Sequence, residues 1–227
     1  MAGFTGAPPI VTDGLVFAVD AANYESYPGS GTTWSDLSGN GNNGTLTNGP
    51  TFDSGNGGNI VFDGANDFID TSFNATSYFP LTICTWINID DTSGVQIIVD
   101  QSTGASGLGF RTNSSGIDAF WYASGNNNLS SIIPSYTPGE WAYICVVFDT
   151  NSSKGYLNGS LKNSNTLTLT SVTATNDTTN NMDIGKLNDG NSNYIGAKIA
   201  QIKIYNHALT PSEVLQNYNA LKGRFGL

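Results

Sequence analysis

Charged residues are scarce in this chain of 227 residues. Asp, Glu, Lys and Arg together make up 11% of it, against roughly 25% in an average globular protein. Only eight residues are Lys or Arg, and 18 are Asp or Glu, so the net charge is −10. Nucleic acid and anionic membrane surfaces attract clustered basic residues, so we expect neither as a partner. A neutral ligand such as a glycan, or a cation such as Ca²⁺, suits this charge balance better.

Cysteine, histidine and long apolar runs are also rare. Cys84 and Cys145 lie in apolar, strand-like runs, and we predict buried free thiols, with pairing left open if their strands are neighbours. His207 is the only histidine, and no Gly-x-Ser-x-Gly motif accompanies it. No run approaches the 18 apolar residues of a membrane-spanning helix. The first residues lack the basic and apolar regions of a signal peptide.

Glutamate is nearly absent, which bears on glycan hydrolysis. That reaction needs two carboxylic acids across a cleft, and the only glutamates are Glu25, Glu140 and Glu213. Glu213 belongs to a predicted helix cap, and Glu140 follows a Pro-Gly turn. Aspartate pairs such as Asp63 and Asp67 remain possible, although a turn explains Asp63. We therefore predict a protein that is not an enzyme.

Asn, Ser, Thr and Gly replace the missing charge, which is typical of short strands joined by many turns. Alternating and apolar runs predict about a dozen strands. These cover 15–19, 44–47, 59–62, 67–70, 81–89, 95–100, 107–111, 117–123, 141–148, 155–161 as a hairpin, 166–173, 182–185 and 199–205. The predicted fold is all-β, a two-sheet antiparallel β-sandwich (jelly roll) with one short C-terminal helix. It spans residues 13–227, after a flexible N-terminal arm at residues 1–12.

The last strand and the helix carry the clearest patterns. In 199–205, alternation predicts Ile199, Gln201, Lys203 and Tyr205 on one face, opposite Ala200, Ile202 and Ile204. Thr210-Pro-Ser-Glu213 reads as a capping box with Pro at the first helical position. The predicted apolar stripe of the helix is Val214, Leu215, Tyr218 and Leu221, and Gly223 is predicted to end it.

The segment 34–46 has the densest set of side-chain oxygens in the chain. Asp36, Ser38 and Asn40 are spaced two apart and Gly41 follows, which is how a calcium loop begins. The acid that closes such a loop is missing, because position twelve is Thr47. We predict a structural Ca²⁺ site formed by Asp36, Ser38, Asn40 and Asn43. The alternative is a series of turns in which these side chains bond to nearby backbone.

A second segment combines aromatic and polar residues. Glycan binding uses an exposed aromatic ring stacked on a sugar, with polar groups on its hydroxyls. The candidates for a carbohydrate site are Arg111, Trp121, Tyr122 and Asn126. The alternative is that Trp121 or Tyr122 is ordinary core, since alternation places only one of the two on each face.

The order of motifs resembles the laminin G-like, or concanavalin A-like, jelly-roll family. The motifs that carry the resemblance are Gly14-Leu-Val-Phe, Asp36-Leu-Ser-Gly-Asn-Gly, Ile60-Val-Phe-Asp-Gly, Leu81-Thr-Ile-Cys-Thr-Trp, Gly139-Glu-Trp, Tyr156-Leu-Asn-Gly and the strand from Ile199. Relatives often carry an acid in the last strand where this chain has Gln201. The segments 26–34 and 217–227 look like versions of the domain carried by tailed bacteriophages, particularly those of marine hosts.

The resemblance implies a location and a set of partners. We predict a non-enzymatic protein of a phage virion surface, either a capsid decoration or a fibre-associated protein. Its partners would be virion proteins of the capsid or tail. The alternative is a lectin-like module that recognises host surface glycans.

Overall fold

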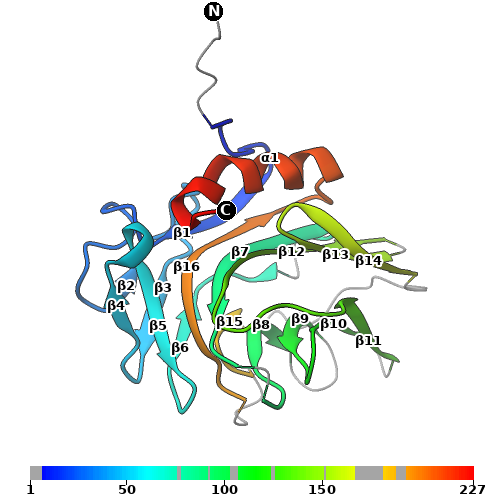
Figure 1. Cartoon of the computed structure of the whole chain (residues 1–227), viewed down its shortest axis with the longest axis horizontal. Coiled ribbons are helices and arrows are strands. Elements are labelled where there is room, and N and C mark those ends of the chain that lie inside the picture. Colours follow the sequence, from blue (N-terminus) through cyan, green and yellow to red (C-terminus); the bar gives the residue numbers. More distant parts are fainter. Residues whose placement is uncertain are drawn as a thin grey trace, which may run out of the picture.

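The structure is a computed structural model that describes residues 7–75, 78–91, 93–102, 107–123, 126–150, 152–166, 181–187 and 193–227. For 122, 123 and 126–129 it describes the backbone alone. Two sheets, each with eight strands, face each other, and one helix lies against the outer side of the first (Figure 1). Among the described residues, no helix has the length and apolar character needed to cross a membrane.

Sheet A runs in the order β14 (Ser160–Thr166), β13 (Ser152–Leu157), β12 (Trp141–Asp149), β7 (Leu81–Ile89), β16 (Gly196–Tyr205), β5 (Asn59–Asp63) and β4 (Thr51–Asp53), with β1 (Leu15–Asp20) also paired to β16. Sheet B runs in the order β11 (Asn126–Ile133), β10 (Ile117–Ala123), β9 (Gly107–Thr112), β8 (Ile97–Ser102), β15 (Asp183–Ile184), β6 (Phe68–Thr71), β3 (Gly44–Thr47) and β2 (Thr33–Trp34). The helices are η1 (Gly55–Gly57), α1 (Pro211–Leu221) and η3 (Lys222–Phe225).

This architecture confirms the predicted antiparallel sandwich with a C-terminal helix. Most predicted strands are present within a few residues of their expected bounds. Three strands were not expected: β2, β4 and β11. They are short or rich in Asn and Ser, so they lack the apolar alternation that identifies a strand. Most of the strand predicted at 166–173 lies outside the described residues.

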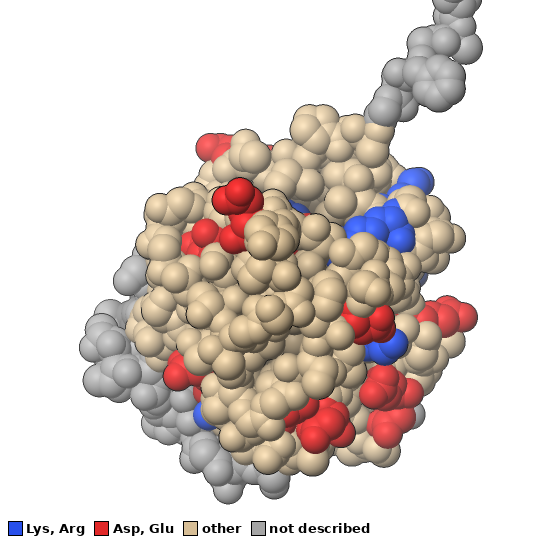
Figure 2. Space-filling view, turned by 90° about the vertical axis from the view of Figure 1, so that its left-hand side faces the viewer, with Lys and Arg blue, Asp and Glu red and all other residues tan. Residues whose placement is uncertain are grey.

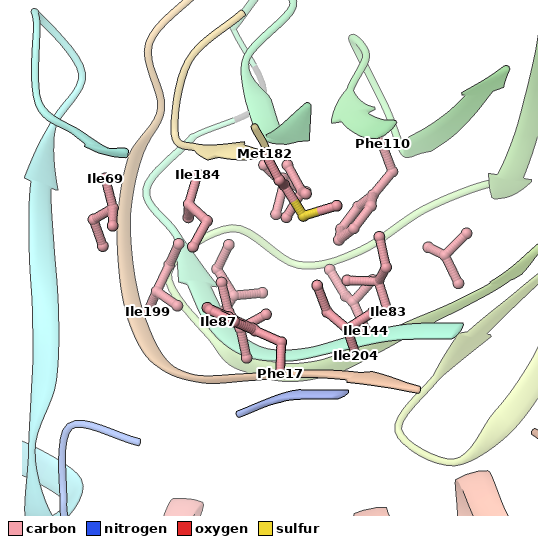
Figure 3. Packing of buried hydrophobic residues seen from close by; sticks show 14 of the residues in the cluster. Phe17, Ile69, Ile83, Ile87, Phe110, Ile144, Met182, Ile184, Ile199 and Ile204 are labelled. Carbon is pink, nitrogen blue, oxygen red and sulfur yellow. The ribbon is translucent and has the colours of Figure 1, made fainter. Parts of the chain in front are cut away.

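The main core fills the space between the two sheets. Isoleucines from both sheets meet there with Phe17, Phe110 and Met182 (Figure 3). Sheet A contributes Ile83, Ile144 and Ile204 to this layer, and sheet B contributes Ile69 and Ile184. Burial of so many β-branched side chains supplies the main driving force for the fold.

A second core lies on the other face of sheet A, beneath the helix. The ring of Trp86 on β7 stacks on Phe225, with ring centroids 4.2 Å apart, and on Tyr218 at 5.8 Å. Val214 of the helix is fully buried in the same cluster. Sheet A is therefore covered on both faces, which accounts for the nearly unbroken apolar runs in its central strands.

The two cysteines belong to this second core. Cys84 on β7 lies directly opposite Cys145 on β12, so the two strands are neighbours. Both residues are buried free thiols, as predicted. Burial raises the pKa of the Cys145 thiol well above its usual range, which keeps it protonated and unreactive.

An irregularity in β16 corrects the prediction for the last strand. The pairing of β16 with β7 shifts between Ile199 and Gln201, as in a β-bulge, and a bulge reverses the alternation that follows it. Ile199 therefore faces the main core together with Ile202, whereas Ala200 and Tyr205 belong to the core under the helix. The predicted grouping of Ile199 with Tyr205 was wrong for this reason.

The helix begins as predicted, and α1 ends at Leu221, before Gly223. The hydroxyl of Thr210 accepts a hydrogen bond from Glu213 N, and the Glu213 carboxylate accepts one from Thr210 N at 2.7 Å. Leu215 is 44% exposed, so it does not belong to the buried stripe. The chain continues past Gly223 as the short 3₁₀ helix η3, and Gly226 adopts the left-handed conformation with φ 74°.

The loop after β2 covers the open edge of β1. The amide of Ala18 donates to Asp36 Oδ1 at 2.9 Å, and Leu37 N donates to Ala18 O at 2.7 Å. The carbonyl of Val16 accepts bonds from the Ser38 hydroxyl at 3.0 Å and from Asn40 Nδ2 at 3.1 Å. Unpaired edges of a sheet invite pairing with other chains, so this loop closes the sheet where β1 has no neighbouring strand.

Part of the predicted flexible arm is attached to the domain. Val11 is buried, its N–H donates to Asn217 Oδ1 at 2.8 Å, and its carbonyl accepts from the Tyr205 hydroxyl at 3.1 Å. Gln216 Nε2 donates to the carbonyl of Pro9 at 2.8 Å. From Pro9 onward the arm therefore lies on the helix. Residues 1–6 are outside the described residues.

The loop that covers β1 yields a stability prediction. The Asp36 carboxylate accepts bonds from Ala18 N, Ser38 N, Ser38 Oγ and Asn42 N. Asp36→Ala leaves these donors without an acceptor, and we expect it to lower the free energy of unfolding by about 2–4 kcal/mol. Denaturant unfolding measures the change. The matched control is Asp149→Ala, which removes a partly exposed carboxylate whose bonds to described residues are those to its neighbour Thr150 and to Lys154. Equal losses in the two variants would contradict the structural role of Asp36.

Candidate functional site

A hollow opens at the end of the sandwich that lies opposite the helix. Three loops form it: the β5–β6 turn, the β7–β8 loop and the segment before β16 (Figure 1). Its volume is about 450 Å³, within the range of small-molecule sites. We call it the rim hollow; the side chains that define it are those of Asp63, Asp90, Asp91, Gln96, Asn193 and Tyr194.

Gln96 connects two of these loops. Its Nε2 donates to Asp91 Oδ1 at 2.8 Å, and its Oε1 accepts from Gly196 N at 3.0 Å. The amide of Ile97 donates to the carbonyl of Asn193 at 2.9 Å, which fixes the same two segments a second time. The third loop approaches closely because Gly64 has φ +74° and a Cβ there would lie 3.4 Å from Gly196. The hollow is therefore largely preformed.

The carboxylates of the rim hollow carry negative charge. Hydrogen bonds from the Ala65 and Asn66 amides lower the pKa of Asp63. Bonds from the Ser93 amide and hydroxyl, and then from Gln96, lower the pKa of Asp91. Burial raises the pKa of the neighbouring Asp67, whose Oδ2 accepts from Asp63 N. At neutral pH the hollow thus presents ionised hydrogen-bond acceptors.

Some acceptors in the rim hollow are not used within the protein. The side chain of Asp90 is exposed and takes part in none of the hydrogen bonds or ion pairs between described residues. The bonds to Asp91 all end on its Oδ1, and those to the Asp63 side chain end on its Oδ1. The second oxygen of each carboxylate can therefore accept bonds from a ligand.

A second hollow adjoins the first. It has a volume of about 510 Å³, and half-buried Tyr136 and Trp141 line it together with Glu140, Asn158 and Lys162. The Tyr136 hydroxyl donates to the carbonyl of Asp91 at 3.0 Å, so this residue separates the two hollows. Burial, with a smaller contribution from Asp91, raises the pKa of Tyr136 to about 12. Its hydroxyl therefore remains a donor.

The two hollows together combine the groups that bind polyhydroxylated ligands. Carboxylate and amide oxygens accept bonds from hydroxyl groups, and the rings of Tyr194, Tyr136 and Trp141 offer apolar faces against which a sugar ring can stack. Acidic side chains occur in several small groups on the surface shown in Figure 2, and basic side chains are few. An acidic ligand would be repelled at the rim hollow, so a neutral one fits better.

The carbohydrate site predicted from the sequence does not form as expected. Trp121 is 2% exposed, and its ring packs on Phe79 at 4.7 Å and Phe148 at 6.0 Å. It is a core residue and cannot stack on a sugar. Arg111 lies on the opposite face of sheet B, with its guanidinium 5.9 Å from the centre of the Phe120 ring. The side chains of Tyr122 and Asn126 lie outside the described residues.

The predicted calcium ligands do lie together, but their groups bond to one another and to β1. Both oxygens of Asp36 accept hydrogen bonds from protein donors, and Asn43 Oδ1 accepts from Asp36 N at 2.9 Å. Ser38 and Asn40 direct donors at the Val16 carbonyl. A cation here would have to displace these donors, so the arrangement does not fit a calcium site. The described residues also contain no group of three His, Cys, Asp or Glu side chains suited to a metal ion.

The sequence contains no direct signal that Tyr136, Trp141 and Tyr194 are surface residues. Each lies in or next to a loop, where no alternation tells an exposed ring from a buried one. The available signal was the Asp90-Asp91 pair, which directly follows a long strand. Because β7 and β16 are antiparallel, β7 ends where β16 begins, so this pair lies beside the segment before β16. Among the acids named for hydrolysis, Glu140 lines the second hollow and Glu213 is used in the helix cap. In the pair Asp63 and Asp67, the Asp67 carboxylate accepts a hydrogen bond from Asp63 N.

Solved structures with the same fold come mainly from larger proteins. The binding domain of Paraclostridial Mosquitocidal Protein 1 matches with a TM-score of 0.72 and 20% identity, over 92% of this chain and 52% of that one. Botulinum neurotoxin type C, in a structure concerned with cell entry through two ganglioside molecules, matches with a TM-score of 0.73 and 16% identity, over 93% and 52%. This chain thus spans about half the length of these toxin chains.

A third structure is close to this chain in size. Domain 4 of AbnA, an extracellular arabinanase from Geobacillus stearothermophilus, was solved in complex with arabinotriose. It matches with a TM-score of 0.71 and 19% identity, over 90% of this chain and 98% of that one. At these identities the likeness extends to the fold alone.

Two comparisons concern the sequence itself. No curated protein matches the chain. A family model described as the concanavalin A-like lectin/glucanases superfamily matches residues 63–215, well over half of the chain. The match runs from the last residue of β5 to the middle of α1, and so includes both hollows. The chain belongs to the concanavalin A-like lectin/glucanases superfamily.

Proposed function

We propose that the domain is a glycan-binding module whose site is the rim hollow, extended by the second hollow beside it. The observation that carries this proposal is the pairing of uncommitted acceptors at Asp63, Asp90 and Asp91 with the partly exposed ring of Tyr194. Similar folds that bind arabinotriose or depend on gangliosides support it by analogy.

The charge of the site selects among glycans. Three carboxylates at one hollow repel sialic and uronic acids and favour neutral or amino-bearing sugars. The two hollows adjoin at Tyr136, so an oligosaccharide can contact both. We infer binding without hydrolysis. Glu140 is the one carboxylic acid among the residues that line the second hollow. In the rim hollow, Asp63 and Asp91 have lowered pKa values, so they stay ionised and cannot serve as the acid.

A glycan array followed by calorimetry tests this function. We expect binding to neutral oligosaccharides, and at least a tenfold loss of affinity, about 1.4 kcal/mol, in Asp90→Ala and Tyr194→Ala. The controls are Asp149→Ala and Tyr24→Ala, which change a partly exposed carboxylate and a 77% exposed ring elsewhere. A wild-type chain that binds no glycan on the array would refute the proposal, and so would equal losses in the control variants.

We infer that the loop at Asp36 keeps its structure without calcium. Because protein donors already occupy the oxygens of Asp36, we expect neither added calcium nor a chelator to change the melting temperature by more than about 1 °C. Differential scanning calorimetry with and without chelator measures this. A rise with calcium that disappears in Asp36→Asn would instead establish the calcium site predicted from the sequence.

The virion surface is the location we propose for the module, as predicted from the sequence. One observation favours attachment through the helix side: the first described residues and the C-terminus both lie beside α1, opposite the rim (Figure 1). An assembly holding the domain there would leave both hollows facing outward.

Deletion of residues 1–8 tests the attachment while keeping the bonds of Pro9 and Val11 to the helix. We expect the shortened protein to melt at the same temperature and to be lost from purified particles, as measured by quantitative mass spectrometry. Unchanged incorporation would rule out an anchoring role for these residues.

A further inference from the structure

A third hollow lies on the helix side of the molecule, away from the rim. It has a volume of about 340 Å³ and lies between β1, β16, the start of the described chain and the end of α1. Apolar residues make up much of its wall, and they include Ile10, Leu15, Ala18, Leu37 and Leu221. We call it the lysine hollow, because Lys203 is part of its wall.

Lys203 lies in this hollow because of the bulge in β16. The shifted pairing after Ile199 places Gln201 and Lys203 on the outer face of sheet A. Ala18 of β1 pairs with Lys203 on one side, and Cys84 of β7 pairs with it on the other. The lysine is only 6% exposed, and a lysine is rarely buried to this extent without a partner.

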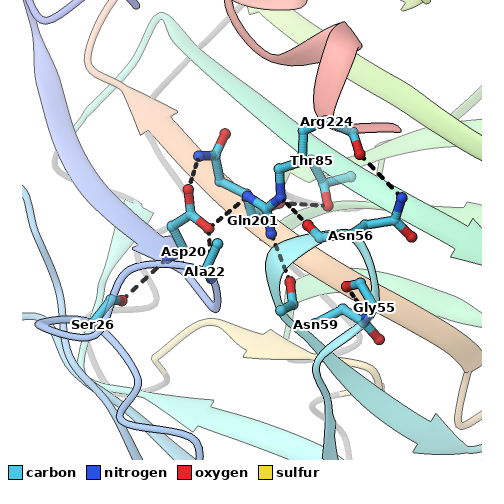
Figure 4. A network of polar contacts seen from close by, with 10 residues as sticks. Asp20, Ala22, Ser26, Gly55, Asn56, Asn59, Thr85, Gln201 and Arg224 are labelled. Carbon is cyan, nitrogen blue, oxygen red and sulfur yellow. Dashed lines mark hydrogen bonds and ion pairs between the residues drawn. The ribbon is translucent and has the colours of Figure 1, made fainter. Parts of the chain in front are cut away.

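The nearest acid is already engaged by other groups. Asp20 Oδ1 accepts from Arg224 Nη1 at 2.8 Å, and Asp20 Oδ2 accepts from Gln201 Nε2 at 2.7 Å (Figure 4). Ala22 N also donates to Oδ1, at 2.9 Å. Arg224 in turn donates to the carbonyls of Gly58 and Asn56. This network is complete without Lys203.

Lys203 itself has no such partner. It takes part in none of the ion pairs or hydrogen bonds between described residues. The network contains one carboxylate, Asp20, and two cations, Arg224 and Lys203, so the group carries a net charge of about +1 at neutral pH. Lys203 is 6% exposed and forms no ion pair with a described residue. Removing a charge from water without such a pair is costly, and an anion that entered the hollow would relieve that cost.

We propose that the lysine hollow binds a small amphipathic carboxylate, with its acid group on the Lys203 ammonium and its apolar chain or ring against the apolar wall. A single negative charge matches the local charge of +1. The volume of about 340 Å³ lies at the lower end of ligand sites, which suits a molecule of roughly eight carbons. This site is separate from the rim hollow, and it does not depend on glycan binding.

The protonation of Lys203 limits the pH range of binding. Burial lowers its pKa to about 8, partly offset by Asp20 and Cys84, while Arg224 lowers it further. The ammonium form therefore dominates at pH 7 and is lost above pH 8. Because the pKa in the folded state lies below that of an unfolded chain, protonation disfavours folding below about pH 8, and this penalty fades as the pH rises towards 10.

Calorimetry with octanoate at pH 7 tests the proposal on the full chain. We expect one molecule to bind, and Lys203→Met to weaken binding at least tenfold. The matched control is Lys198→Met on the same strand, whose ammonium pairs with Asp53 at 3.0 Å and is half-exposed; it should bind octanoate as the wild type does. Octylamine should not bind, because its charge is repelled, and octanol should bind more weakly than octanoate.

A second variant keeps the test decisive if Lys203→Met folds poorly. Leu37 is 39% exposed at the hollow, so Leu37→Asp leaves the core intact and places a repelling charge beside the ligand. We expect it also to lose octanoate binding. For the wild type, affinity should fall about tenfold or more between pH 7 and pH 9.5. Absence of octanoate binding at millimolar concentration, or equal binding of octanoate and octanol, would overturn the proposal.

Discussion

Sheet A is buried on both of its faces, by sheet B on one side and by the C-terminal helix on the other. Its strands must therefore present apolar side chains in both directions, and the bulge after Ile199 decides which side chain of β16 faces which core. The Trp86–Phe225 stack holds the helix in place, and the helix in turn holds the first described residues. The cover of this sheet thus depends on two segments more than 200 residues apart in the chain.

The same arrangement leaves the two ends of the molecule with different chemistry. At the rim, the strands of both sheets end in loops that no helix covers, so polar side chains and partly exposed rings remain available. On the helix side, β1, the loop at Leu37 and the end of α1 meet in a hollow whose wall includes Lys203. A polar, acidic hollow and an apolar hollow with a cation therefore coexist in one domain, one at the rim and the other on the helix side.

The candidate site could be predicted from the sequence only in part. The acids at Asp63, Asp90 and Asp91 lie in turns that the strand pattern locates, but Tyr136 and Tyr194 lie in loops without periodicity. The segment around Trp121 was misleading, because an aromatic ring beside Arg111 has the composition of a sugar site whichever way it points. Burial against Phe79 and Phe148 decides that Trp121 is core. The loop at Asp36 was misleading in another way. It has the residue types of a calcium site, but it lies next to the open edge of β1 and its side chains bond to the backbone of that strand.

The sequence by itself determined the fold class, the number and order of most strands, and the capping box. These depend on local alternation and turn residues, which can be read along the chain. The tertiary structure alone decided that Asp36 bonds to β1, that Trp121 is buried and that Lys203 is buried with no ion pair to a described residue. Each of these depends on which distant segment lies opposite a given side chain, and a single extra residue in β16 is enough to change that face.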